Sequence, residues 1–213
     1  MSTSNPEIGR SILVNGANVN YHDYGQGAPL FLIHGSGPGV SAWANWRLVL
    51  PKFGETRRAI APDMFGFGFT DRPQGMTYNL DVWVDQVIAL MDALKIEKTD
   101  LVGNSFGGAI ALAVAIRHPD RVRRLILMGS VGVHFPLTKG LDAAWGYTPS
   151  IENMRALLDV FAFDRTLVTM NWPSCGMRPA FVRASKNPSR PCSRLRVRMG
   201  SKLCPAKKRT SKH

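Results

Sequence analysis

The stretch Gly103-Asn104-Ser105-Phe106-Gly107 has the residue types and the spacing that nucleophilic catalysis requires. It has the form Gly-x-Ser-x-Gly, in which a serine on a sharp strand-to-helix turn holds its hydroxyl clear of the sheet. Glycines suit the flanking positions because neighbouring chain approaches too closely there for a Cβ atom. Ser105 is therefore the predicted nucleophile, and the backbone N–H of Phe106 is predicted to contribute to an oxyanion hole.

A second chemical feature is the glycine-rich stretch His-Gly-Ser-Gly-Pro-Gly at 34–39, which follows the apolar run 29–33. A continuous apolar run is typical of a strand that is buried on both faces. A glycine-rich loop after such a strand exposes backbone N–H groups, which can hold developing negative charge. We expect this loop and the serine turn to lie on neighbouring strands, at the carboxyl ends where parallel sheets bind ligands.

The elements that must position these loops alternate between strand and helix. An opening hairpin is predicted around Asn15-Gly16, between two β-leaning runs. Strands are predicted at 29–33, 57–61, 100–102 and 121–128. A later helical segment is predicted at 151–161, and helices are predicted at 42–53, with Ser41 as N-cap, at 80–94 and at 109–116. The last of these helices is apolar on every side and is expected to be buried. This order predicts an α/β fold, with a mostly parallel sheet and helices on both faces.

Composition divides the chain in two. Residues 1–164 hold all 15 acidic residues beside 14 basic ones, whereas residues 165–213 hold 13 basic residues and no acid. The three cysteines also fall after residue 164. The net charge of +12 is thus a property of the tail and says little about the folded part.

The same composition bounds the expected partners. No apolar run approaches the roughly 20 residues of a membrane span, and the first residues show no signal-peptide pattern. We therefore expect a cytoplasmic protein with reduced thiols and no membrane partner. The tail carries no nucleic-acid-binding motif, so only unspecific, salt-sensitive binding to polyanions is expected of it. No cofactor and no metal site is predicted.

Several stretches resemble the meta-cleavage product hydrolases of the α/β-hydrolase superfamily, over residues 5 to about 169. The matching stretches are LIHGSGPG (32–39), SAWANWR (41–47), APDM (61–64), GNSFGG (103–108), MGSVGV (128–133) and AWGYTPS (144–150). The resemblance implies an α/β-hydrolase fold and cleavage of a carbon–carbon bond in ring-fission products of catechols. Such substrates are 2-hydroxymuconic semialdehyde and 2-hydroxy-6-oxo-heptadienoate. It further implies a small-molecule substrate, no cofactor, and the family's homo-oligomeric state.

The resemblance also implies roles for individual residues. Ser105 is expected to be the nucleophile or to activate water, and the N–H groups of Ser36 and Phe106 to form the oxyanion hole. The residues expected to bind substrate are Gly35, Gly37, Asn45 and Asn104.

Other polar residues of the matching stretches have structural interpretations. Asn104 would equally suit the unusual backbone of the turn. Asp63 is expected to tie its loop to backbone N–H groups, and His34 to hydrogen-bond to neighbouring loops. His118 suits a helix C-terminus before Pro119.

A serine nucleophile needs a base, and in this superfamily an acid and then a histidine follow the serine along the chain. The family places them after two further strands, which this sequence lacks. Later histidines are His118, His134 and His213. No triad Asp or His is identifiable, and His134 is a weak substitute because it follows the strand 121–128. We therefore expect impaired catalysis from a fold truncated after the start of the lid.

Residues 170–213 do not match the family. Deleting one base from the family's usual Asp codon after Thr169 would shift its sequence into the one found from Met170 to Pro188. We hypothesise that the tail is a frameshift product, which the same frame in independent isolates would contradict. The predicted parts are the N-terminal core (1–134), a partial helical lid (135–169) and a disordered basic tail (170–213).

Two alternatives stay open. The first is a general serine esterase of the same fold, which substrate profiling would separate from a C–C hydrolase. The second is an inactive truncated product that binds polyanions through its tail. Heparin retention that disappears on deletion of residues 170–213 would identify the latter.

Overall fold

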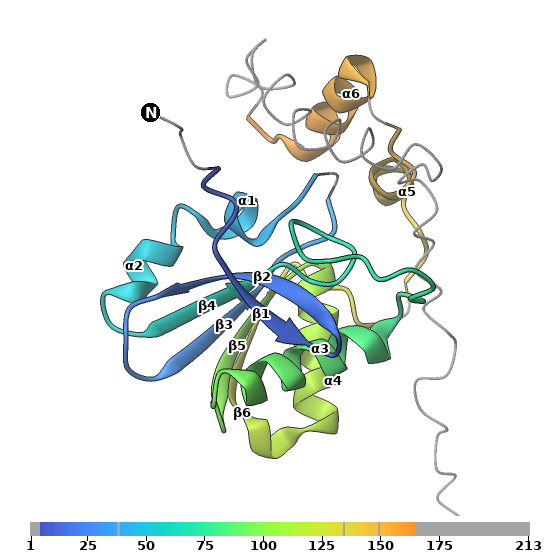
Figure 1. The fold of residues 1–213 in the computed structure, drawn as a ribbon. Coiled ribbons are helices and arrows are strands. Elements are labelled where there is room, and N and C mark those ends of the chain that lie inside the picture. The colour runs from blue at the N-terminus through green and yellow to red at the C-terminus, as the bar shows by residue number, and fades with distance from the viewer. Residues whose placement is uncertain (1–4, 38, 134, 149, 165–213) are drawn as a thin grey trace, which may run out of the picture.

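The computed structural model describes residues 5–37, 39–133, 135–148 and 150–164. The expectations for His134 and for the tail 170–213 lie outside the described residues. The centre of the molecule is a six-stranded sheet of order β1-β2-β4-β3-β5-β6 (Figure 1).

The first two strands form the predicted hairpin. β1 (Arg10–Val14) pairs antiparallel with β2 (Ala17–Tyr24), and both turn residues, Asn15 and Gly16, have positive φ. β2 then pairs antiparallel with β4. The parallel strands are β3 (Pro29–Ile33), β4 (Arg58–Pro62), β5 (Thr99–Asn104) and β6 (Val122–Met128). The sequence prediction of a mostly parallel α/β sheet is confirmed.

Helices cover both faces of the sheet. The core helices are α1 (Ala42–Trp46), α2 (Leu50–Gly54), α3 (Leu80–Ala93) and α4 (Phe106–Arg117). Phe31 and Ile33 of β3 pack in one core cluster with residues of α3 and α4, whereas Leu30 and Leu32 pack in the other with residues of α1 and α2. Because successive side chains of a strand point to opposite faces, this uninterrupted apolar run serves both cores.

The prediction of one helix at 42–53 is wrong, because the segment forms two short helices with a break at 47–49. Pro51 explains the break, since it has no N–H to donate to the carbonyl of Arg47. The predicted cap is confirmed: the Ser41 hydroxyl accepts a hydrogen bond of 3.0 Å from the Ala44 N–H.

One expectation of burial also fails. Ile116 of α4 is 66% exposed, because the buried residues of this helix form a stripe that leaves Ile116 on the solvent side. β6 is the edge of the sheet in the described part of the chain, and its Ile126, Leu127 and Met128 are between 42% and 55% exposed. Apolar surface therefore remains open on this strand.

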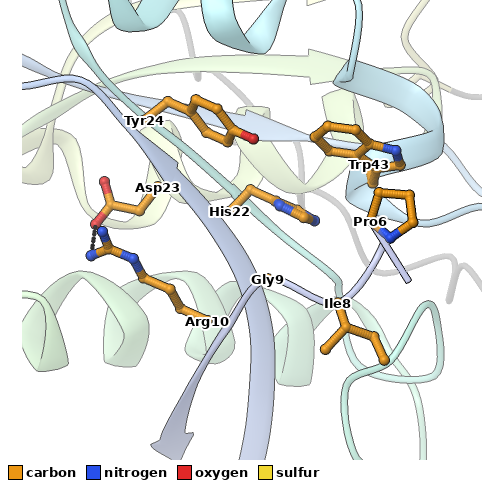
Figure 2. A pocket seen from close by; sticks show the side chains of 8 residues that line it. All are labelled: Pro6, Ile8, Gly9, Arg10, His22, Asp23, Tyr24 and Trp43. Atoms are coloured by element: carbon orange, nitrogen blue, oxygen red, sulfur yellow. Dashed lines mark hydrogen bonds and ion pairs between the residues drawn. The ribbon is translucent and has the colours of Figure 1, made fainter. Parts of the chain in front are cut away.

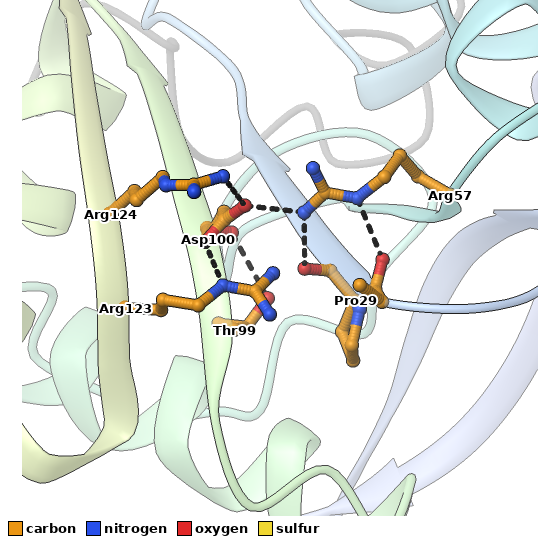
Figure 3. A network of polar contacts seen from close by, with 7 residues as sticks. Pro29, Arg57, Thr99, Asp100, Arg123 and Arg124 are labelled. Carbon is orange, nitrogen blue, oxygen red and sulfur yellow. Dashed lines mark hydrogen bonds and ion pairs between the residues drawn. The ribbon is translucent and has the colours of Figure 1, made fainter.

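An ion-pair network occupies the start of β5 (Figure 3). Asp100, 4% exposed, accepts hydrogen bonds from Arg57 and, at 2.7 Å, from Nε of Arg123. Arg57 also donates to the carbonyls of Ala28 and Pro29. The hydrogen bonds from Arg123 and Arg57 hold the pKa of Asp100 below its usual value, although burial acts against them.

Two further helices follow β6. They are α5 (Lys139–Trp145) and α6 (Ile151–Phe161), and the bounds of α6 are those predicted. Their buried side chains form a cluster of their own, made of Ala144, Tyr147, Met154 and Leu157. Figure 1 shows this pair, in orange, beyond the core helices. No helix in the described part of the chain is long and apolar enough to cross a membrane.

Candidate active site

Ser105 occupies a strained backbone position between β5 and α4. Its φ of 53° and ψ of −114° lie outside the regions that a residue with a side chain normally adopts. The turn is held because the Ser105 N–H donates to the Met128 carbonyl at 2.8 Å, and the Gly108 N–H donates to the Ser105 carbonyl at 2.9 Å. The predicted sharp strand-to-helix turn is confirmed.

The glycines around Ser105 allow backbone to pack directly on backbone. A Cβ atom at Gly103 would lie 2.5 Å from the Cα of Gly108, and one at Gly107 would lie 2.6 Å from the carbonyl oxygen of His34. Real Cβ atoms do not approach other atoms so closely. The sequence interpretation of Gly103 and Gly107 is therefore confirmed.

The loop after β3 lies against this turn, because β3 and β5 are parallel neighbours. Asn45 joins the two. Its side-chain oxygen accepts a hydrogen bond of 3.0 Å from the Gly35 N–H and another of 3.1 Å from Nδ2 of Asn104. A Cβ atom at Gly35 would lie 3.6 Å from the Cβ of Ser105. The structure thus brings together four of the predicted site residues: Gly35, Asn45, Asn104 and Ser105.

His34 fixes the orientation of the loop. The Met64 N–H donates to its Nε2 at 3.0 Å, so the proton of the neutral ring must sit on Nδ1, which donates to the Gly35 carbonyl at 2.6 Å. This carbonyl and the Ser36 N–H belong to one planar trans peptide and point in opposite directions. The buried histidine therefore turns the Ser36 N–H away from the ring. The expectation that His34 hydrogen-bonds to neighbouring loops is confirmed.

Phe106, the source of the second predicted oxyanion-hole donor, is held by aromatic packing. Its ring makes an edge contact with Trp83 at a centroid distance of 4.6 Å and lies 5.5 Å from Phe67. Phe67 in turn contacts His34 at 5.3 Å. In the described part of the chain, neither the Phe106 N–H nor the Ser36 N–H has an acceptor. Both donors are thus available to a ligand.

The Ser36 side chain has a partner that the sequence analysis missed. Nε1 of Trp145, the last residue of α5, donates a hydrogen bond of 3.2 Å to the Ser36 hydroxyl. Trp145 lies within the stretch 144–150, which resembles the family in sequence, and this resemblance was the signal that could have identified it as a site residue. Gly37, by contrast, is exposed and has no atom within 4 Å of an added Cβ, so no contact here joins it to the site.

No base accompanies the nucleophile among the described residues. No hydrogen bond to the Ser105 hydroxyl is found there. His118 caps the far end of the 12-residue helix α4, about 18 Å away at 1.5 Å per residue. His22 lies on β2, and His134 lies outside the described residues. Within the described ranges, no group of three or more potential metal-ligating side chains is found.

Asp63 has the structural role expected of it. Its carboxylate accepts hydrogen bonds of 2.6 Å from each of the Ala42 and Phe69 N–H groups, and one of 2.9 Å from Nδ2 of Asn20. It thereby joins β2, α1 and the loop after β4 from a fully buried position.

A separate pocket of about 320 Å³ lies beside β2 and does not include Ser105 (Figure 2). Its lining residues are Pro6, Ile8, Gly9, Arg10, His22, Asp23, Tyr24 and Trp43. The rings of His22 and Trp43 lie 5.1 Å apart. Burial lowers the pKa of His22, although the negative charge of Asp63 acts in the opposite direction.

Comparison with known proteins agrees with this geometry. The chain is 66% identical over 165 residues to a 2-hydroxymuconate semialdehyde hydrolase from a Pseudomonas species, covering 78% of this chain and 58% of the relative. It is 59% identical over 169 residues to a 2-hydroxy-6-oxo-2,4-heptadienoate hydrolase from Pseudomonas putida, covering 79% and 61%. The chain thus spans about three fifths of the length of these curated relatives.

Solved structures extend the comparison. A meta-cleavage product hydrolase from Pseudomonas fluorescens is 54% identical with a TM-score of 0.85, and the match covers 90% of this chain and 69% of that one. A 2-hydroxy-6-oxo-6-phenylhexa-2,4-dienoate hydrolase from a Rhodococcus strain is 28% identical with a TM-score of 0.74, over 82% and 65%. The family model described as alpha/beta hydrolase fold matches residues 28–200. With its strained serine turn, this chain belongs to the α/β-hydrolase family.

Proposed function

We propose that this protein hydrolyses a carbon–carbon bond in 2-hydroxy-6-oxo-dienoate ring-fission products, with Ser105 as the nucleophile or the activator of water. The observation that carries the proposal is the juxtaposition of Ser105 with the loop that bears the unpaired Ser36 N–H. The names of the relatives at 66% and 59% identity support the substrate class.

The chemistry follows from where negative charge develops. Attack on the ketone carbon of the substrate converts its carbonyl oxygen into an oxyanion, which the N–H groups of Ser36 and Phe106 would stabilise. One such donor contributes about 10²- to 10³-fold in rate. Because the dienol substrate first tautomerises to its keto form, the carbon–carbon bond can break with its electron pair passing into the keto-acid portion, which takes up a proton and leaves as a dienol. The acyl portion leaves as a carboxylic acid. With Ser105 as nucleophile, water hydrolyses the Ser105 ester and restores the hydroxyl; with Ser105 as activator, water itself has attacked and the acid forms directly.

Asn45 and Asn104 are proposed to bind the substrate's carboxylate and oxygen substituents. The Asn45 oxygen is already occupied by the Gly35 N–H and by Asn104. Its Nδ2 group has no acceptor in the described part of the chain and is a donor for a carboxylate. Gly35 and Gly37 would form the adjoining backbone wall.

Turnover is expected to be slow. Triad enzymes that lose their base lose about 10⁴- to 10⁶-fold in rate, although an oxyanion hole retains some catalysis. No triad base is proposed: His134 is only a weak substitute and lies outside the described residues. We place the protein in the cytoplasm, with a small-molecule substrate and no membrane or specific nucleic-acid partner. Homo-oligomers are implied for the family but are not proposed for this truncated chain.

The test is the loss of absorbance of 2-hydroxymuconic semialdehyde and of 2-hydroxy-6-oxo-hepta-2,4-dienoate, incubated with the wild-type chain and with Ser105→Ala. We expect the wild-type chain alone to accelerate the loss. Ser11→Ala, which removes an exposed hydroxyl from β1, is the matched control. Equal rates for wild type and Ser105→Ala would refute the role of Ser105. A p-nitrophenyl ester as parallel substrate separates this activity from general esterase activity.

A further inference from the structure

The hydrogen bond between Trp145 and Ser36 joins two segments that are 109 residues apart. An indole N–H can only donate, so the Ser36 hydroxyl must accept. The hydroxyl proton of Ser36 then stays free to point elsewhere. Both residues are half-buried, so water competes less well for this bond than it would at an exposed site.

The lid side of this bond is a unit with its own packing. The small cluster between α5 and α6 is separate from both core clusters. A Cβ atom at Gly140 would lie 3.0 Å from Cγ1 of Val160, which shows how closely the two helices approach. The Gly146 N–H donates to the Asp142 carbonyl at 2.7 Å and ends α5 directly after Trp145. The indole must therefore follow any movement of this helical pair.

On the loop side, hydrogen bonds from the core fix the residue before Ser36. His34 and Asn45 hold the Gly35 backbone. Beyond Ser36, Gly37 is exposed, and its carbonyl accepts a hydrogen bond of 3.1 Å from the Val40 N–H, a contact within the same loop. The indole bond is the contact that restrains the Ser36 side chain from the direction of the lid.

We propose that Trp145 is a positioning residue that couples the helical pair α5–α6 to the oxyanion loop through the Ser36 hydroxyl. The inference rests on the proposed function in so far as the Ser36 N–H serves as an oxyanion donor. When the lid lies over the site, the indole holds Ser36 in the orientation that His34 imposes on its peptide. When the lid moves away, this restraint is lost and the donor becomes mobile.

The test is nuclear magnetic resonance of the full chain with ¹⁵N-labelled tryptophan. Its five tryptophans give separate indole signals, and Trp145→Phe identifies the signal of Trp145 by its disappearance. In Ser36→Ala, we expect this signal to shift. The exchange of the indole proton with water should accelerate by about tenfold, because one hydrogen bond is lost. Ser36→Thr keeps a hydroxyl and should restore slow exchange, whereas Ser11→Ala should change nothing.

A second readout tests positioning rather than packing. In Trp145→Phe, which keeps an aromatic ring but no donor, the ¹⁵N order parameter of the Ser36 amide should fall, while that of the Leu101 amide within β5 stays unchanged. An unaltered Trp145 signal in Ser36→Ala, or an unaltered Ser36 amide in Trp145→Phe, would overturn the proposal. Neither measurement needs turnover, so failure here is distinct from failure of the Ser105→Ala comparison.

Discussion

The two ends of β5 serve opposite purposes within six residues of chain. At the start of the strand, the carboxylate of Asp100 is bound by Arg57 and Arg123, and Arg57 is further tied to two carbonyls (Figure 3). At its end, Ser105 is strained and its hydroxyl has no partner in the described part of the chain. Polar groups are satisfied where the strand is anchored and left open where a ligand would bind.

This difference shows how a parallel sheet can carry strain at one edge. A backbone conformation such as that of Ser105 costs about 1–3 kcal/mol and persists only where its surroundings over-determine it. The ion pairs at Asp100, together with the buried side chains of β3 and β5, hold the strand that presents the serine. The largest effects should therefore come from changes that push β5 and the start of α4 apart at the serine turn.

Gly103→Val should have the largest effect. The new side chain would overlap the backbone of Gly108, so we expect the free energy of unfolding to fall by about 4 kcal/mol, enough to prevent folding. Chemical denaturation followed by circular dichroism measures this. Gly37→Ala is the control, because its Cβ meets no atom within 4 Å, and it should unfold like the wild type. Similar midpoints for the two variants would show that the close approach at the turn is dispensable.

His34→Phe should be next. The phenyl ring preserves the buried shape but leaves the Met64 N–H and the Gly35 carbonyl without their partners. Because two buried groups each lose a hydrogen bond, we expect the free energy of unfolding to fall by about 3 kcal/mol. The same variant should lower the ¹⁵N order parameter of the Ser36 amide, because the loop loses its hydrogen bond to His34. If stability falls while the order parameter of Ser36 is unchanged, His34 supports the fold but does not orient the loop at 34–37.

Asp100→Asn probes the other end of the strand. Loss of the negative charge leaves the positive charges of Arg57 and Arg123 next to each other without their counter-ion. We therefore expect the free energy of unfolding at neutral pH to fall by about 2 kcal/mol. Because the pKa of Asp100 is lowered on folding, its contribution is present above the unfolded value of about 3.9 and is lost as the pH falls below it. The difference in the free energy of unfolding between wild type and Asp100→Asn should therefore disappear at acid pH.

The exposed Asp85→Asn is the matched control for this measurement, since no ion pair of Asp85 is found in the described part of the chain. It should leave the free energy of unfolding at neutral pH unchanged. If the difference in the free energy of unfolding between wild type and Asp100→Asn stays constant down to acid pH, the charge of Asp100 does not stabilise the fold.

Of these substitutions, His22→Phe should change stability least. Burial lowers the pKa of His22, so the unfolded chain binds a proton at a higher pH than the folded chain does. Its neutral form therefore favours folding above about pH 6.5, and that contribution is lost as the pH falls through the lowered folded value. Denaturation at about pH 7.5 and pH 5 should show less acid sensitivity in His22→Phe than in wild type.

Much of the scaffold was predictable because its signals are local. The run 29–33 and the segment 151–161 were predicted with the bounds that the structure shows, since apolar periodicity and flanking turn residues mark their ends. The division of the helix at 47–49 was missed because the proline at position 51 was given too little weight. The exposure of Ile116 was missed because a helix that is apolar on every side gives no sign of which side faces solvent.

The sequence by itself determined the serine turn, since Gly103, Ser105 and Gly107 are the residue types that such a sharp turn permits. It also determined that the loop at 34–37 would lie nearby, because consecutive parallel strands end at one edge of the sheet. Only the tertiary structure decided that the indole of Trp145 meets the Ser36 hydroxyl. Contacts across 109 residues depend on how the lid helices pack, and packing has no local signature in the sequence.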